Sequence, residues 1–99
     1  MYMLPVPATG LFTGKKTVTT AGTAVQLTTL RATNQAGLYV KALEDNTGKI
    51  YIGTSDVDSD TGFELGAGDL IIMTLEDNSL IYIDASVSGE GVTFMGFTS

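Results

Sequence analysis

The chain has 99 residues, a net charge of −6 and neither cysteine nor histidine. That length holds one domain with one thin core, such as two packed sheets. The missing residue types exclude disulfides, thiolate zinc sites and nucleophile–base pairs built on Cys or His. With only five basic residues, the chain lacks the basic stripe that phosphate binding requires, so we expect no nucleic-acid partner.

The apolar segments of the chain are short. The longest run is Leu70-Ile71-Ile72-Met73, which is far below the length that spans a bilayer. The first basic residue is Lys15, so the N-terminus lacks the basic region of a secretory signal. We therefore expect neither a membrane partner nor a targeting segment.

The first ten residues are predicted to form an extended N-terminal arm. Pro5 and Pro7 are poorly compatible with a helix or a central strand, and the segment carries four large apolar side chains: Tyr2, Met3, Leu4 and Val6. Either the domain itself or a neighbouring subunit could cover these side chains. We hypothesise that residues 1–10 lie on a neighbouring protein, and we assign residues 11–99 to a single β-sandwich domain.

From residue 11 onward, apolar and polar residues alternate with the period of a β-strand. Strands are predicted at 17–20, 24–28, 38–43, 50–52, 63–65, 70–75, 80–83 and 92–97. We expect the run 70–75 to be buried on both faces. No window shows a helical period. The prediction is an all-β fold, a single small antiparallel β-sandwich or barrel of seven to eight short strands, either jelly-roll or Ig-like.

Two segments of the chain resemble each other. In each, a strand end of sequence Leu-Glu-Asp-Asn leads through a turn to Ile-Tyr-Ile, first at 43–52 and again at 75–83. Asp45-Asn46-Thr47-Gly48 has the residues of a hairpin turn. The sequence therefore predicts that 50–52 is the return strand of a hairpin.

One acidic loop is a candidate metal site. Asp56, Asp58 and Asp60 alternate along it, and calcium prefers several oxygen ligands around one centre. The loop departs from an EF-hand, because its glycine is one position late and the twelfth position is Ala67. Two interpretations stay open: a weak irregular calcium site completed by Glu64 or Asp69, or a solvated loop that keeps a sheet edge from pairing. We assign no metal ligand and no cofactor.

No catalytic centre is expected, so no catalytic or cofactor-binding residue is assigned. A carboxylate pair acting on a sugar would need a cleft and usually aromatic platforms. The chain has no tryptophan, and the tyrosines of the sheet region lie in predicted strands, where they pack across strands. The sequence predicts a non-enzymatic protein.

The order of motifs over residues 36–97 resembles small β domains that recur in tailed-phage structural proteins. The motifs are Ile50-Tyr51-Ile52-Gly53, Ser55-Asp56-Val57, Gly62-Phe63-Glu64-Leu65, Ala67-Gly68-Asp69, the run Leu80 to Ser86, and Gly89-Glu90-Gly91-Val92. Such domains act as capsid decoration or cement proteins, head-fibre bases or tail components.

The resemblance implies a structural protein of a phage virion, with a capsid decoration or cement protein favoured. The implied partners are the major capsid protein or other virion proteins, and the implied state is a homo-oligomer, with a trimer as one arrangement. Two alternatives stay open. One is a head–tail or tail component; the other is a carbohydrate- or ligand-binding β-sandwich module, for which Tyr51 beside Asp56–Asp60 is the only hint.

Overall fold

The structure is a computed structural model that describes residues 10–29, 37–75 and 77–98. These residues form eight strands and one 3₁₀ turn, without an α-helix, so the all-β prediction is confirmed. The elements are β1 (Gly10–Thr17), β2 (Val25–Gln26), β3 (Leu38–Ala42), β4 (Ile50–Gly53), β5 (Phe63–Leu65), β6 (Leu70–Met73), η1 (Asn78–Leu80), β7 (Tyr82–Ala85) and β8 (Gly91–Thr98).

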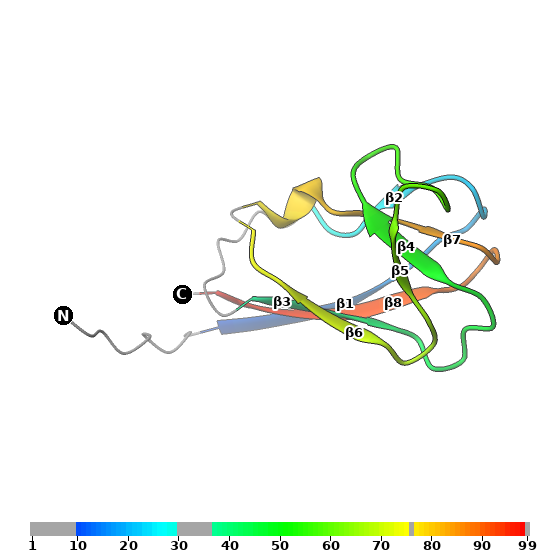
Figure 1. Cartoon of the computed structure of the whole chain (residues 1–99). Coiled ribbons are helices and arrows are strands. Elements are labelled where there is room, and N and C mark those ends of the chain that lie inside the picture. The colour runs from blue at the N-terminus through cyan, green and yellow to red at the C-terminus, as the bar shows by residue number, and fades with distance from the viewer. Residues whose placement is uncertain (1–9, 30–36, 76, 99) are drawn as a thin grey trace.

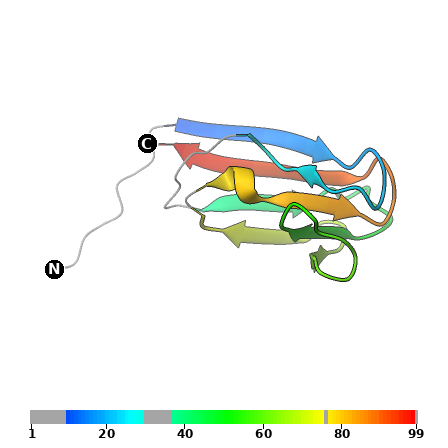
Figure 2. The same cartoon turned by 90° about the horizontal axis from the view of Figure 1, so that it is seen from above.

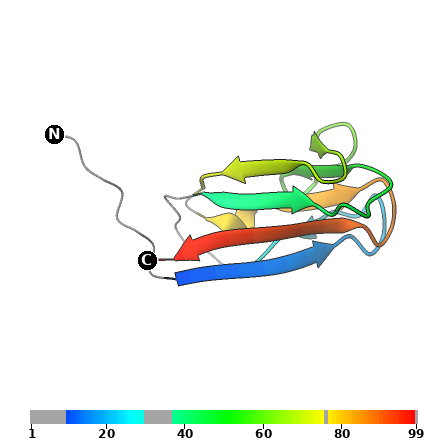
Figure 3. The same ribbon diagram turned by 90° about the horizontal axis from the view of Figure 1, so that it is seen from below.

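The strands form two four-stranded antiparallel sheets that pack face to face. Sheet A has the order β1-β8-β3-β6, and sheet B has the order β2-β7-β4-β5. Figure 1 shows sheet B above sheet A. Figure 2 looks down on sheet B, and Figure 3 looks up at the four strands of sheet A side by side. The predicted β-sandwich is therefore correct.

The pairing order identifies the topology as a jelly roll. β1 pairs with β8, β2 with β7, β3 with β6 and β4 with β5, as if one long hairpin with its tip between β4 and β5 were rolled up. Eight strands in two sheets with Greek-key connections define the jelly roll. An Ig-like fold would instead place several consecutive strands in the same sheet.

The core lies between the sheets and follows the alternation of the strands. Leu38, Val40 and Ala42 of β3 point inward, as predicted for that strand, and meet Ile50 and Ile52 of β4. The remaining members of the buried cluster come from seven further positions: Val18, Leu27, Leu65, Ile81, Ile83, Ala85 and Val92. Hydrophobic burial therefore stabilises this domain through one thin apolar layer between the two sheets.

The predicted hairpin at Asp45-Asn46-Thr47-Gly48 is wrong. β3 belongs to sheet A and β4 to sheet B, so the turn carries the chain from one sheet to the other. Among consecutive strands, only β4 and β5 lie in the same sheet. Asp and Asn side chains form hydrogen bonds with the backbone of a tight turn, and Gly adopts the backbone angles that such turns require. Because this holds for any tight turn, the local sequence does not distinguish a hairpin from a sheet-to-sheet connection.

The two similar segments both make such connections. The second leads from β6 in sheet A through η1 to β7 in sheet B. Asn46 and Asn78, which occupy equivalent positions in the two segments, are both buried. Asn46 Nδ2 donates to the Gly91 carbonyl (2.9 Å), and its Oδ1 accepts from the Gly91 N–H (3.3 Å). The buried asparagine thereby fixes the β3–β4 connection to the start of β8.

The first strand begins earlier than predicted. β1 covers Gly10–Thr17, whereas residues 18–20 turn away from it. Gly10, which the sequence assigned to the arm, pairs with Thr98 at the start of β1. Tyr2, Met3, Leu4 and Val6 of the predicted arm lie outside the described residues.

Candidate interaction surface

The outward face of sheet A is the candidate interaction surface. Because side chains alternate along each strand, the residues that do not point into the core share this face. From β1 and β8 they are Leu11, Thr13, Lys15, Thr17, Thr93, Met95 and Phe97; from β3 and β6 they are Tyr39, Lys41, Leu70 and Ile72. This set is called the outer face of sheet A below.

Large apolar side chains are exposed on this face. Leu11 is 62% exposed, and Leu70 and Ile72 are each 54% exposed. The prediction that the run 70–75 is buried on both faces is therefore wrong. β6 is the edge strand of sheet A, and sheet B covers only its inner side, where Ile71 and Met73 pack against the core.

The centre of the face is aromatic and apolar. Tyr39 stands opposite both Met95 of β8 and Ile72 of β6. Its ring meets Phe97 edge to face, with 6.0 Å between the ring centroids. The prediction that Tyr39 packs across strands is thus confirmed, and the contact belongs to the outside of the sandwich rather than to the core.

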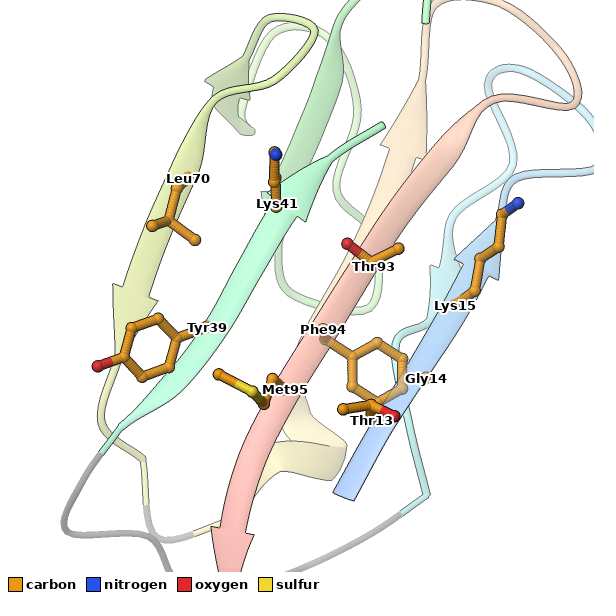
Figure 4. A pocket seen from close by; sticks show the side chains of 9 residues that line it. All are labelled: Thr13, Gly14, Lys15, Tyr39, Lys41, Leu70, Thr93, Phe94 and Met95. Carbon is orange, nitrogen blue, oxygen red and sulfur yellow. The ribbon is translucent and has the colours of Figure 1, made fainter. Parts of the chain in front are cut away.

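A shallow hollow of about 640 Å³ opens on this face beside the aromatic centre (Figure 4). It is lined by Thr13, Gly14, Lys15, Tyr39, Lys41, Leu70, Thr93, Phe94 and Met95. The lining offers apolar surface, two ammonium groups and three hydroxyls, but no carboxylate. It is suited to burying an apolar group and to neutralising negative charge next to that group.

The outer face of sheet A carries positive charge in an acidic protein. Lys15 and Lys41 project from it, as Figure 4 shows, and none of its outward positions is acidic. Lys41 Nζ lies 3.2 Å from Glu44 Oε1, and the two side chains are 45% and 76% exposed. Such an exposed ion pair contributes little to stability, so Lys41 can exchange Glu44 for another carboxylate.

A glycine in β1 has a packing role on the inner side of sheet A that the sequence analysis missed. Gly14 of β1 faces Phe94 of β8, and a Cβ atom on Gly14 would overlap the Phe94 ring. The ring therefore occupies the space that a side chain at position 14 would take. The repeated pattern Phe-x-Gly, at 12–14 and at 94–96, is the sequence signal that could have revealed this arrangement.

The acidic loop between β4 and β5 lies on the other side of the molecule, above sheet B in Figure 1. Asp58 Oδ1 accepts hydrogen bonds from the N–H of Asp60 (2.9 Å), and from the hydroxyl (3.2 Å) and the N–H (3.1 Å) of Thr61. The Asp60 N–H, followed by the Thr61 hydroxyl and N–H, lowers the pKa of Asp58 below its ordinary value. Asp56 accepts from the Thr54 hydroxyl instead (2.7 Å).

These contacts show what the three carboxylates do in the loop. Within the described ranges, no three acidic side chains come together as ligands for one ion. Asp58 closes its own turn, while Asp56 and Asp60 are exposed. The structure therefore brings together no cluster at Asp56, Asp58 and Asp60, and Glu64 and Asp69 do not complete one.

The loop packs against the sheet through Val57. Val57 is buried, and a Cβ atom on either Gly53 or Gly62 would collide with its side chain. Tyr51, beneath Gly62, is only 8% exposed. A sugar needs an exposed aromatic face for stacking, and Tyr51 does not offer one, so the hint that favoured a carbohydrate-binding module is removed.

In the described segments, no helix is long and apolar enough to cross a bilayer. Comparison with protein-family models, with curated proteins and with solved structures gives no match to this chain. The function is therefore inferred from the residues and the geometry.

Proposed function

We propose that this chain is a non-enzymatic structural protein of a phage virion, most specifically a capsid decoration or cement protein, that stabilises the head through protein–protein contacts. The observation that carries the proposal is the outer face of sheet A, where Leu11, Leu70 and Ile72 are exposed around an aromatic centre. Contiguous exposed apolar surface with a polar rim marks interaction sites on soluble proteins.

The chemistry of the chain supports a contact function over catalysis. The hollow holds lysines, threonines and a tyrosine without a carboxylate, and the sequence has no histidine or cysteine. The fold supports the proposal by analogy alone, because jelly rolls occur in viral capsid proteins as well as in lectins. The order of motifs that resembles tailed-phage domains adds a second, independent line of support.

The proposed partners are the major capsid protein or other virion proteins, and the proposed location is the virion. The two lysines suit a partner surface that is apolar at its centre and acidic at its rim. Complementary charge of this kind fixes orientation and speeds association more than it adds affinity.

Binding to particles that lack this protein tests the proposal. Ile72→Glu places a charge in the middle of the outer face of sheet A, and we expect it to reduce co-sedimentation with the particles. Leu80→Glu is the matched control, because Leu80 is 62% exposed but lies on η1, away from this face. Both positions are solvent-exposed, so a far-UV circular dichroism spectrum should show both variants folded.

Two results would contradict the proposal. One is Ile72→Glu binding to particles as well as the unaltered protein does. The other is specific binding of a glycan, with or without calcium, at a site that Ile72→Glu disrupts, which would assign the face to a ligand-binding module instead.

A further inference from the structure

The free edge of β1 is the longest open sheet edge in the described part of the chain. β1 covers eight residues and pairs with β8 alone, whereas the other edge strands, β6, β5 and β2, have four, three and two residues. Figure 3 shows β1 at the rim of sheet A, with no described segment beside its free side. Such an edge presents backbone N–H and C=O groups that can pair with another strand.

We propose that two copies of this chain pair through β1, antiparallel, with Thr13 of one copy opposite Thr13 of the other. The two copies of sheet A, with four strands each, then form one continuous sheet about a two-fold axis perpendicular to it. The interface is isologous, because the same strand is used by both copies. This inference goes beyond the proposed function and does not depend on it.

The inward side chains of β1 fit this pairing. They are Gly10, Phe12, Gly14 and Lys16, so that a glycine alternates with a large residue. Directly opposite residues of an antiparallel pair lie on the same face of the sheet. With Thr13 at the centre, Phe12 stands opposite Gly14 of the other copy, and Lys16 stands opposite Gly10. Each large inward side chain therefore meets a glycine across the new edge.

The β1–β8 pair already uses this complementarity. Phe12 faces Gly96 and Gly14 faces Phe94, and a Cβ atom on either glycine would overlap the facing ring. A shift of the β1–β1 register by two residues would place Phe12 opposite Phe12 in one direction and opposite Lys16 in the other. Among registers that keep both inner faces on one side, only the proposed one gives every large inward residue a glycine partner.

The outward side chains also suit this register. Leu11, which is 62% exposed, comes to lie opposite Lys15 of the other copy, and the aliphatic stem of a lysine can cover an apolar neighbour. Thr13 meets Thr13 on the axis, and a cross-strand threonine pair stabilises an antiparallel sheet. The pairing therefore removes from water an apolar side chain that the single copy leaves exposed.

The charges of β1 select the same register. Lysines on an edge strand discourage pairing where they face each other. In the proposed register the two copies of Lys15 are four residues apart along the strands, about 13 Å, and the two copies of Lys16 are farther apart still. These separations exceed the Debye length of about 8 Å at physiological ionic strength, whereas a register centred on either lysine would place like charges directly opposite.

The pairing has a consequence for any partner of the outer face of sheet A. Because the axis is perpendicular to the sheet, both copies present this face on the same side. A partner surface with repeated sites is then bound by two faces at once, which strengthens binding without a new contact.

Charge exchange at the axis tests the inference by analytical ultracentrifugation. We expect the mean mass of the unaltered protein to rise with concentration from monomer to dimer and no further. Thr13→Lys and Thr13→Glu each place like charges opposite one another, and each should raise the dissociation constant at least about tenfold. An equimolar mixture of the two variants should restore the dimer. Thr93→Glu is the matched control, because Thr93 is exposed on β8, one strand away from the edge.

Cysteine cross-linking checks the register, and the absence of native cysteine makes each introduced thiol unique. With a short thiol-reactive cross-linker, Thr13→Cys should link to itself. Lys15→Cys should not link to itself, but it should link to Leu11→Cys when the two variants are mixed. Thr13, Lys15 and Leu11 are all exposed, so far-UV circular dichroism should show every variant folded.

The outcomes separate this inference from the proposed function. An unaltered protein that stays monomeric at every concentration would overturn the β1 pairing, as would a Thr13→Lys and Thr13→Glu mixture that forms no dimer. Self-linking of Lys15→Cys without that of Thr13→Cys would overturn the register. A monomer that still binds particles through the outer face of sheet A would leave the proposed function standing. A dimer with the expected cross-links that binds no particle would support the pairing and contradict the particle function.

Discussion

At the scale of single residues, two phenylalanines and two glycines set the register of the longest strand pair. Phe12 of β1 faces Gly96 of β8, and Gly14 of β1 faces Phe94 of β8. Each ring lies over the opposite glycine, and the two rings meet edge to face with centroids 6.4 Å apart. A slip of this register would place side chains where the rings lie, so the pattern specifies the pairing.

Gly96→Ala is expected to destabilise the domain by about 1–3 kcal/mol, because the added methyl group overpacks the Phe12 ring. Urea denaturation followed by circular dichroism measures the loss. Thr13→Ala is the control, since Thr13 lies on the same strand pair and points outward.

The cause of that loss can be checked with a second substitution. Phe12→Leu shortens the side chain that the new methyl group meets, so Gly96→Ala/Phe12→Leu should be less destabilised than the sum of its single variants. Strict additivity of the two changes would show that the Phe12–Gly96 contact does not set the cost.

At the scale of elements, the connections at one end of the sandwich hold one another in place. Glu90, just before β8, accepts hydrogen bonds from the Thr47 N–H (2.7 Å), the Thr47 hydroxyl (2.8 Å) and the Gly48 N–H (2.9 Å). The β7–β8 connection is thereby joined to the β3–β4 connection.

Glu90 should make stability depend on pH. The N–H groups of Thr47 and then Gly48 lower its pKa below the ordinary value of 4.5. A carboxyl whose pKa is lower in the folded state stabilises the protein above its unfolded pKa and loses that contribution as pH falls through the folded pKa. Glu90→Gln should therefore destabilise the protein at pH 7, and the difference from the unaltered protein should shrink below about pH 4.5.

Thermal denaturation from pH 7 down to pH 3 checks this expectation. Glu64→Gln serves as the control, because it removes an exposed carboxylate that makes only a long ion pair with Lys49. A difference between Glu90→Gln and the unaltered protein that stays constant across this range would contradict the assigned role.

At the scale of the whole molecule, the two sides of the sandwich differ in character. The outer face of sheet A is apolar with two lysines, while sheet B is covered in part by an acidic loop anchored by Val57. Both surfaces are formed by a domain whose described core includes no residue before Phe12.

Deletion of residues 1–9 should leave the melting temperature nearly unchanged and should reduce binding to particles. Burying four such side chains is worth about 1.5–3 kcal/mol each, and fixing the backbone costs about 1–2 kcal/mol per residue, so these residues should bind only to a preformed surface. The deletion stops before Gly10, because Gly10 pairs with Thr98 in β1.

Differential scanning calorimetry and co-sedimentation with particles measure the two effects. A truncated chain that melts much lower would assign residues 1–9 to the domain's own core. Unchanged particle binding would show that the segment makes no contact with the particle.

The sequence by itself determined the fold class, most strand positions and the inward faces of the strands. Alternation in 38–42 predicts which side chains share a face, since successive residues of a strand point to opposite sides. The acidic turns and the short extended patch at 63–65 are also local features, and the structure has β5 at that patch. These properties depend on backbone geometry and residue type within a few positions.

Only the tertiary structure decided which strands pair and what covers each face. Turn residues are compatible with any tight turn. The sequence therefore predicts a hairpin at Asp45–Gly48, although the chain crosses from one sheet to the other there. An apolar strand such as 70–73 reads as buried on both faces, yet its position at the edge of sheet A leaves Leu70 and Ile72 exposed. Burial of a strand face depends on elements that are distant in the chain. Alternation therefore shows which side chains share a face, but it does not show which face another element covers and which face stays exposed.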